Sequence, residues 1–207
     1  MAYDPAKVLI YHITNVANLQ SIIVEDGLYS DAAMAKRHPS VVIGYDHIKI
    51  RRLQKIPVPC CQRRYVGEFV PFYFCPRSPM LFTVNKGNTG HVIGCQKDIV
   101  HLVSTVAAGI ATGKAWAVSS GNAGAFHTTY SAKLEALDGL DWEAIRATQW
   151  QGKQHQKMAE FLVADHFPWS AIQGIGCQNS VTAAKVREIL TGAKYQPAVE
   201  VKTSWYY

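Results

Sequence analysis

Residues 159–163, Ala-Glu-Phe-Leu-Val, place a carboxylate at the head of a strongly apolar run. Aromatic and β-branched residues in so short a run are typical of a buried strand. The run follows a long polar tract, residues 120–158, so Glu160 is expected where a sheet meets a cleft. A buried carboxylate is costly without a partner. The residues alone therefore leave two alternatives for Glu160, a partner in an ion pair or a reacting group.

The N-terminal run Val-Leu-Ile-Tyr-His-Ile-Thr at residues 8–14 predicts a second buried strand. It contains His12, and a histidine inside an apolar strand is more often a hydrogen-bonded core residue than a catalytic one. Asn15 is expected to cap a following helix, and Gly27 is expected to end that helix in a left-handed conformation. This segment therefore predicts a strand, a helix and a turn.

The rest of the chain alternates strand-like and helix-like patterns without a repeat or a linker. Residues 29–64 have weak periodicity and predict short helices and loops. These patterns favour a single mixed α+β domain over residues 1–207. We expect further strands at residues 69–74, 99–105, 114–119, 160–163, 172–177 and 199–207, and helices at residues 107–112, 141–147 and 182–190.

Positive charge is concentrated in one segment of the 207-residue chain, whose formal net charge is +6. Residues 36–64 contain eight lysines and arginines against one acid, Asp46, so the remainder of the chain carries almost no net charge. Such a cluster is typical of contact with a polyanion, either a nucleic acid, a phosphorylated cofactor or an anionic surface. A solvated loop with incidental cations is the alternative.

Several classes of protein are disfavoured by composition and motifs. A 48% hydrophobic content argues against disorder, and no apolar run is long enough to span a membrane. The first residues lack the layout of a secretory signal, so we expect a soluble, cytoplasmic protein without membrane contact. Five scattered cysteines fit no metal pattern, and no glycine-rich nucleotide-binding motif is present. We therefore expect no metal site.

Several segments, in their order and spacing, resemble DarT, a family of bacterial DNA ADP-ribosyltransferase toxins that belong to toxin–antitoxin pairs. The resemblance covers residues 8–207 and extends more distantly to poly-ADP-ribose polymerases. The segments that carry it are Tyr-His-Ile-Thr-Asn at 11–15, Pro-Phe-Tyr-Phe-Cys-Pro-Arg-Ser-Pro-Met at 71–80, Ser-Ser-Gly-Asn-Ala at 119–123, Ala-Glu-Phe-Leu-Val at 159–163 and Trp-Tyr-Tyr at 205–207.

The resemblance implies an ADP-ribosyltransferase fold, with two packed, mostly antiparallel sheets around an NAD+ cleft and helices on their flanks. It implies that NAD+ is a co-substrate, and that ADP-ribose is transferred to N3 of thymine in single-stranded DNA with release of nicotinamide. It also implies a partner, an antitoxin of the macrodomain ADP-ribosyl hydrolase type. We expect a bacterial, cytoplasmic and monomeric enzyme.

The resemblance also implies roles for individual residues. Glu160 and Arg51 would be catalytic, residues 28–50 would cover the cofactor, and residues 132–157 would face the acceptor. The expected NAD+ contacts are His12, Thr14, Asn18, Gly27, Leu28, Tyr45, Arg51 and Tyr73. The expected DNA contacts are Arg52, Trp150, Lys153, Gln154, His155 and Lys157.

The chemistry of these residues is consistent with the implied roles. A fixed carboxylate stabilises the positive charge that builds on ribose as the nicotinamide bond breaks, and a guanidinium favours the deprotonated imide of thymine. Met158 stands where arginine-modifying relatives carry a second glutamate, which argues against an arginine acceptor. Two alternatives remain, an acceptor in RNA or protein and a catalytically silent single-strand-binding module. We expect Glu160→Ala to abolish transfer and to leave the fold intact.

Overall fold

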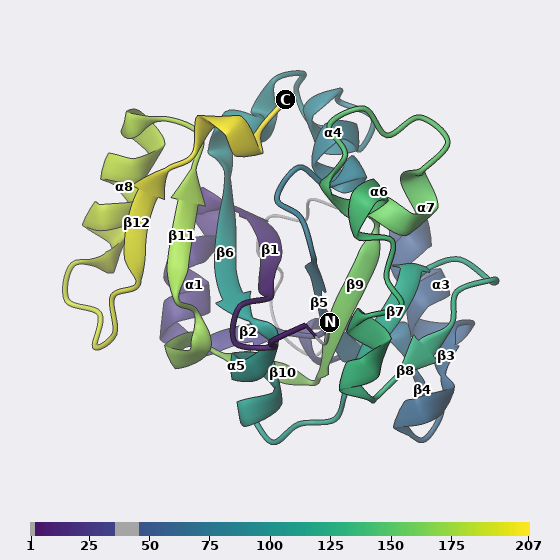
Figure 1. Cartoon of the computed structure of the whole chain (residues 1–207). Coiled ribbons are helices and arrows are strands. Elements are labelled where there is room, and N and C mark those ends of the chain that lie inside the picture. The colour runs from purple at the N-terminus through teal and green to yellow at the C-terminus, as the bar shows by residue number, and fades with distance from the viewer. Residues whose placement is uncertain (1–2, 36–45) are drawn as a thin grey trace.

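An eight-stranded sheet organises the computed structural model, which describes residues 3–35 and 46–207 (Figure 1). Its strand order is β12-β11-β6-β1-β5-β9-β7-β8, and all neighbours are antiparallel except β11 and β12. The expected mixed α+β class is confirmed. The strands are β1 (Leu9–Asn15), β5 (Phe69–Tyr73), β6 (Ile99–Thr105), β7 (Trp116–Asn122), β8 (Tyr130–Ser131), β9 (Ala159–Ala164), β11 (Gly174–Cys177) and β12 (Ala198–Val201).

The sheet is divided into two halves at the junction between β1 and β5. β1 pairs with β6 along all seven of its residues, whereas it meets β5 at the single pair of Tyr11 and Tyr73. The two packed sheets of the sequence analysis are therefore two halves of one ordered sheet. The narrow junction lies beside the residues expected to bind NAD+, because His12 follows Tyr11 directly.

Helices cover the sheet and its two ends (Figure 1). α8 packs beside β11 and β12, and α3 lies near the opposite edge, beyond β7. Two small sheets pair β2 (Gly27–Tyr29) with β10 (His166–Pro168) and β3 (Pro57–Val58) with β4 (Arg64–Tyr65). The α-helices are α1 (Leu19–Val24), α2 (Asp31–Met34), α3 (Asp46–Gln54), α4 (Pro79–Asn85), α5 (Val106–Ala111), α6 (Trp142–Arg146), α7 (Gln154–Lys157) and α8 (Ser180–Leu190).

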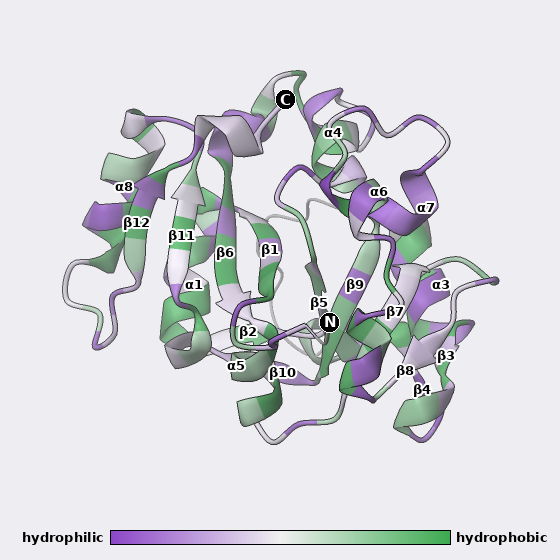
Figure 2. Cartoon of the chain, viewed as in Figure 1, coloured by the Kyte–Doolittle hydropathy of each residue, from purple (hydrophilic) through white to green (hydrophobic). Residues whose placement is uncertain are grey.

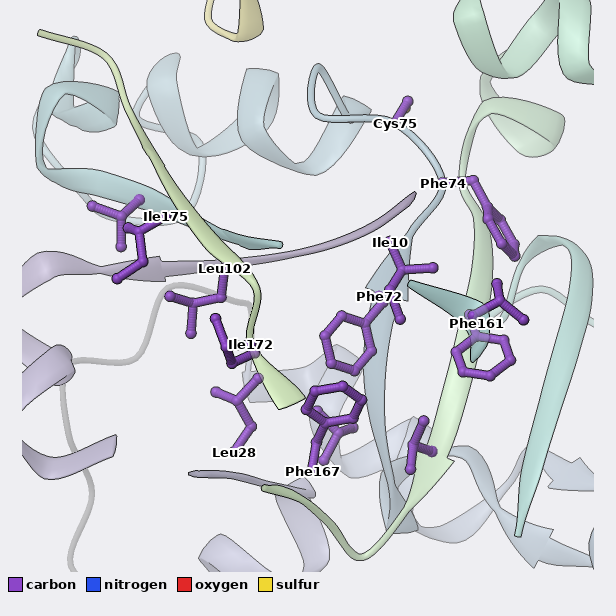
Figure 3. Packing of buried hydrophobic residues seen from close by; sticks show 14 of the residues in the cluster. Ile10, Leu28, Phe72, Phe74, Cys75, Leu102, Phe161, Phe167, Ile172 and Ile175 are labelled. Carbon is purple, nitrogen blue, oxygen red and sulfur yellow. The ribbon is translucent and has the colours of Figure 1, made fainter. Parts of the chain in front are cut away.

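The main core lies where β1, β5 and β9 meet β2 and β10 (Figure 3). The rings of Phe72 and Phe167 pack with centroids 4.6 Å apart, and Ile10 and Leu28 are buried in the same cluster. Full burial of such side chains contributes about 1.5–3 kcal/mol each to stability. This packing fixes β1 and β5, and therefore the residues that they present at the junction.

Two predicted chain features need correction. Asp26, with φ 58°, takes the left-handed conformation expected of Gly27, which opens β2 instead. Gly27 is still required there, because a Cβ at this position would lie 2.1 Å from the Phe167 carbonyl oxygen. The closing strand expected at residues 199–207 ends at Val201, and a 3₁₀ turn follows that places Trp205 against Gly176.

The C-terminal residues close over His101, which lies on β6 and is fully buried. Its Nε2 is 2.9 Å from the Pro76 carbonyl oxygen, and its Nδ1 is 3.2 Å from the Tyr206 hydroxyl oxygen. Because a carbonyl only accepts, Nε2 carries the proton and the ring is neutral. Burial lowers the pKa of His101 to about 4, although the hydrogen bond to Pro76 opposes this shift.

We expect the protein to lose stability in acid through His101. The folded-state pKa is below the ordinary value, so the unfolded chain binds more protons and stability falls as the pH falls from about 6.5 towards 4. The loss from this group approaches about 3 kcal/mol. Urea denaturation at a series of pH values measures it, with His101→Gln, which can still donate to Pro76, as the control. Equal pH slopes for the two proteins would contradict the prediction.

Candidate active site

Glu160 lies near the start of β9, fully buried and opposite Tyr73 in the pairing with β5. Its backbone N–H donates to Oγ of Ser119 on β7 at 2.9 Å. The hydroxyl of Ser119 in turn donates to the Gly121 carbonyl at 2.7 Å. These bonds fix the backbone on both sides of the carboxylate, and Ser119 is a site residue to which the sequence analysis gave no role.

A register shift between β7 and β9 brings a backbone donor to the Glu160 side chain. The shift lies between Val118 and Asn122, and an irregularity of this kind bends a strand and re-aims its groups. The N–H of Ala123 consequently donates to Oε1 of Glu160 at 3.1 Å. The hydroxyl of Tyr130 on β8 donates to the Ala123 carbonyl at 2.6 Å, which holds that peptide in place.

Arg52 on α3 forms a two-pronged ion pair with Glu160. Its Nη2 is 2.8 Å from Oε2 and its Nη1 is 3.2 Å from Oε1. Burial acts to lower the pKa of Arg52, but the Glu160 charge and hydrogen bonds outweigh it, so the pKa is raised. A carboxylate has about four lone-pair positions, and three are occupied by Arg52 and Ala123. Among the described residues no further group donates to Oε2, which keeps one acceptor position.

The structure places the two neighbouring arginines in different surroundings. Arg52, which was expected to contact DNA, reaches Glu160, whereas the Arg51 guanidinium lies over the Phe126 ring, 4.6 Å from its centroid. Consecutive helical residues point about 100° apart, so one side chain of the pair faces β9 and the other faces elsewhere. Arg52 is therefore the arginine that lies beside the carboxylate, and the catalytic role expected of Arg51 stays a prediction.

His12 is placed on β1 next to the junction with β5. Its Nδ1 lies 2.8 Å from the Pro71 carbonyl oxygen, so Nδ1 carries the proton and Nε2 is left as an acceptor. Burial lowers the pKa of His12, and the hydrogen bond to Pro71 and the charge of Asp31 oppose this shift. A neutral imidazole with one acceptor nitrogen is suited to bind a sugar hydroxyl.

Charged groups from α2 and α3 surround this junction. Asp31 and Lys49 form an ion pair at 3.3 Å, and both charges act on His12. The charges of Glu160 and Arg52 both act on Tyr73. Burial, followed by the Glu160 charge, raises the pKa of Tyr73, and the Arg52 charge opposes this shift. Tyr73 therefore keeps its proton and can donate it in a hydrogen bond. The structure brings His12, Tyr73 and Glu160 onto β1, β5 and β9, three neighbouring strands.

The other expected NAD+ contacts lie in the last part of β1, in the turn that follows it and on β2. Asn18 donates to the Thr14 hydroxyl at 3.1 Å, and both residues are buried. Leu28 packs in the main core, so only its backbone, like that of Gly27, can face a ligand. Tyr45 and residues 36–45 of the expected covering segment lie outside the described residues.

Most of the expected DNA contacts lie on or beside α7, which is hydrophilic along its length (Figure 2). Trp150 packs edge-on against Phe82, and Lys153 pairs with Glu143 at 2.6 Å. Gln154 is exposed on the same helix. His155 lies against the ring of His127, with centroids 4.1 Å apart, and burial followed by the His127 charge lowers its pKa. These four residues are positioned at the surface.

Lys157 has to be withdrawn from the expected DNA contacts. Its side chain is buried, and its ammonium donates to the Ile145 carbonyl at 2.9 Å and to the Ala147 carbonyl at 2.8 Å. A lysine that satisfies the last carbonyls of a short helix stabilises that helix end. Lys157 therefore joins α7 to α6 and has no ammonium at the surface to bind a phosphate.

Residues 3–35 and 46–207 contain neither a cluster of metal ligands nor a membrane-spanning helix. In this part of the chain no three histidine, cysteine or carboxylate groups come together as metal ligands. The helices of the same residues include none that is both long and apolar enough to cross a bilayer.

The structure changes the expected result of Glu160→Ala, which was predicted to leave the fold intact. The substitution leaves the Arg52 guanidinium buried without its partner, and breaking such a pair costs about 3–5 kcal/mol. The double variant Glu160→Ala with Arg52→Met removes both charges and should regain most of that stability. Urea unfolding of the three proteins measures this difference. A single variant as stable as the original chain would contradict the importance of the pair.

Comparisons with known proteins identify the family of the chain. The family model described as DarT, ssDNA thymidine ADP-ribosyltransferase, matches residues 11–207. A Thermus aquaticus DNA ADP-ribosyl transferase is 38% identical over 211 residues, which cover 100% of this chain and 92% of the relative. Solved structures of Thermus sp. 2.9 DarT are also similar. Its complex with ADP-ribosylated ssDNA has a TM-score of 0.91, 34% identity and coverage of 100% of this chain and 99% of that one.

A second structure of the same relative, in complex with NAD+, has a TM-score of 0.87 and 32% identity and covers 100% of both chains. The family match spans nearly the whole chain, and both solved structures share its fold. The chain therefore belongs to the DarT family of NAD+-dependent DNA ADP-ribosyltransferases.

Proposed function

We propose that this chain transfers ADP-ribose from NAD+ to N3 of thymine in single-stranded DNA, as one domain over residues 1–207. The observation that carries the proposal is the enclosed Glu160 carboxylate, held by Arg52 and the Ala123 N–H with one acceptor position left on Oε2. Support for the two substrates comes from the Thermus sp. 2.9 relative, whose complexes contain NAD+ and ADP-ribosylated ssDNA.

Glu160 would act on the first bond change. The bond between nicotinamide and the ribose breaks with its electron pair on nicotinamide, and positive charge builds on the sugar. A fixed carboxylate stabilises that charge without rearranging, which is the most effective form of electrostatic catalysis. Oε2 would also accept a hydrogen bond from a ribose hydroxyl, and His12 would accept another through Nε2.

Arg52 would act on the acceptor. Thymine N3 is a weakly acidic imide, and it must lose its proton as it bonds to the ribose carbon. The guanidinium stays charged at any working pH and stabilises the anionic form of the base. The proton of N3 is released to solvent as the bond to the ribose carbon forms. The products are ADP-ribosylated thymine, nicotinamide and one proton, so atoms and charges balance.

The residue two positions before Glu160, Met158, bears on the identity of the acceptor. Met158 contacts the Asn122 amide through its sulfur at 3.8 Å and offers no carboxylate to orient a guanidinium. This position disfavours an arginine acceptor. The relatives named for DNA modification favour DNA over RNA, and an unpaired strand exposes thymine N3 without base flipping.

We further propose that the enzyme is the toxin of a toxin–antitoxin pair. Thymine N3 belongs to the edge of the base that pairs with adenine, so its modification blocks templating and arrests growth. Recovery then requires a partner that removes ADP-ribose from the base. A macrodomain ADP-ribosyl hydrolase is the class of antitoxin that fits this chemistry.

The acceptor can be tested with labelled NAD+ and two single-stranded oligonucleotides that differ only in the presence of thymine. We expect label on the thymine-containing strand alone. A matched RNA with uracil and a duplex of the same sequence serve as controls. Label on both DNA strands would overturn thymine specificity, and binding of DNA without any label would favour the silent module.

The residue roles can be tested with Glu160→Gln, which keeps the size of the side chain and one Arg52 contact. Loss of the carboxylate charge should lower kcat by about 10²- to 10³-fold or more. A urea unfolding curve of the same variant measures the stability that is lost with the ion pair. Arg52→Lys keeps a charge but loses the two-pronged geometry, so transfer should fall more than NAD+ binding. Arg51→Lys serves as the matched control. A larger loss of kcat from Arg51→Lys than from Arg52→Lys would reverse the assignment.

A further inference from the structure

Phe126 is the exposed aromatic residue of the loop between β7 and β8. It is 82% exposed, whereas the other six phenylalanines are buried or half-buried. The loop extends beside α3 at one edge of the molecule (Figure 1). One exposed apolar side chain is ordinary on a protein surface. The position of Phe126 relative to Glu160 distinguishes it from an incidental exposed side chain.

The loop that carries Phe126 is fastened to the catalytic carboxylate. Its first residue, Ala123, donates to Glu160 and accepts from Tyr130. Within the loop, the N–H of Ala125 donates to the Asn122 carbonyl at 2.9 Å. Phe126 is three residues from Ala123, so their Cα atoms are at most about 11 Å apart. This spacing places the ring within reach of a nucleotide next to one bound at Glu160.

One face of the Phe126 ring is supported by a cation. The Arg51 guanidinium lies 4.6 Å from the ring centroid, and Arg51 directly precedes Arg52 on α3. This contact fixes the ring orientation, and the high exposure of Phe126 leaves its other face open to solvent. A ring held this way offers a flat platform on which a nucleic-acid base can stack, with the cation adding to the attraction.

The charge around the platform suits a polyanion. The sequence has no aspartate or glutamate between Asp98 and Glu135, although it has two lysines there. The pair of His127 and His155 lies at the same loop, next to the hydrophilic helix α7 (Figure 2). No acidic side chain of the loop itself would repel a phosphate. These features favour a nucleic-acid strand over an acidic protein as the occupant.

We propose that Phe126, supported by Arg51, stacks on a base adjacent to the thymine that the enzyme modifies. This inference rests on the proposed function and adds a subsite to it. The platform selects an unpaired strand, because a base can stack on the ring only when it is free of its own neighbours. It also explains the position of Arg51, which points away from the carboxylate.

Steady-state transfer to a short oligonucleotide with one thymine tests the platform. Phe126→Ala should raise KM for the oligonucleotide about 5- to 150-fold, which corresponds to the loss of one stacked base, and should change kcat much less. Phe126→Trp should restore binding, while Phe126→Leu, apolar but without a π face, should not. Val181→Ala on α8, where Val181 is 79% exposed at the opposite edge of the sheet, is the matched control.

Abasic oligonucleotides identify the base that stacks. For the original chain, removing one base beside the thymine should raise KM, and in Phe126→Ala the same removal should have little further effect. Equal penalties in both proteins at every position would overturn the platform. Loss of binding to a protein partner without any change in KM for DNA would assign Phe126 to a protein interface instead. Failure of the original chain to modify thymine would refute the proposed function, which is a separate outcome.

Discussion

The ion pair between Arg52 and Glu160 is the interaction on which the site depends. A fully buried carboxylate is costly without a partner, and Arg52 supplies the opposite charge. The pair also joins α3 to β9, which are 108 residues apart in the chain. α3 buries little of its own apolar surface, since Ile48 and Ile50 are exposed. Its docking therefore relies on this pair, on the ion pair between Lys49 and Asp31, and on the close approach of Leu53 to Gly67.

The same pair connects the two halves of the proposed reaction. While Arg52 holds both oxygens, the charge of Glu160 is partly balanced and less of it is available to a ribose cation. When thymine loses its N3 proton, the base becomes a second anion that competes for the guanidinium. Arg52 can then shift towards the base, and Glu160 regains charge at the moment the ribose needs it. The acceptor would thereby promote cleavage of the nicotinamide bond, which limits wasteful hydrolysis of NAD+.

The strands and helices with strong periodicity could be predicted from sequence, and the side-chain directions could not. The bounds predicted for residues 99–105 agree with β6, because a run that is mostly apolar and β-branched ends there at a capping threonine. Arg51 and Arg52 are equivalent in sequence, and only the rotation of α3 decides which one meets Glu160. Lys157 resembles a surface cation in sequence, but two carbonyls of α6 and its flank capture it. Such partners lie on other elements and leave no local signal.

Several cations of the basic segment, residues 36–64, have acidic partners in the structure. Of its described cations, Lys49 pairs with Asp31, Arg52 with Glu160 and Arg64 with Glu68 and Asp165. Three of the cations that suggested a polyanion surface thus join the segment to the rest of the fold. A phosphate backbone would be left with fewer contacts than the formal charge implies, and salt would weaken DNA binding less steeply than a cluster of eight cations predicts. Recognition then has to come from stacking and from the shape of the site more than from net charge.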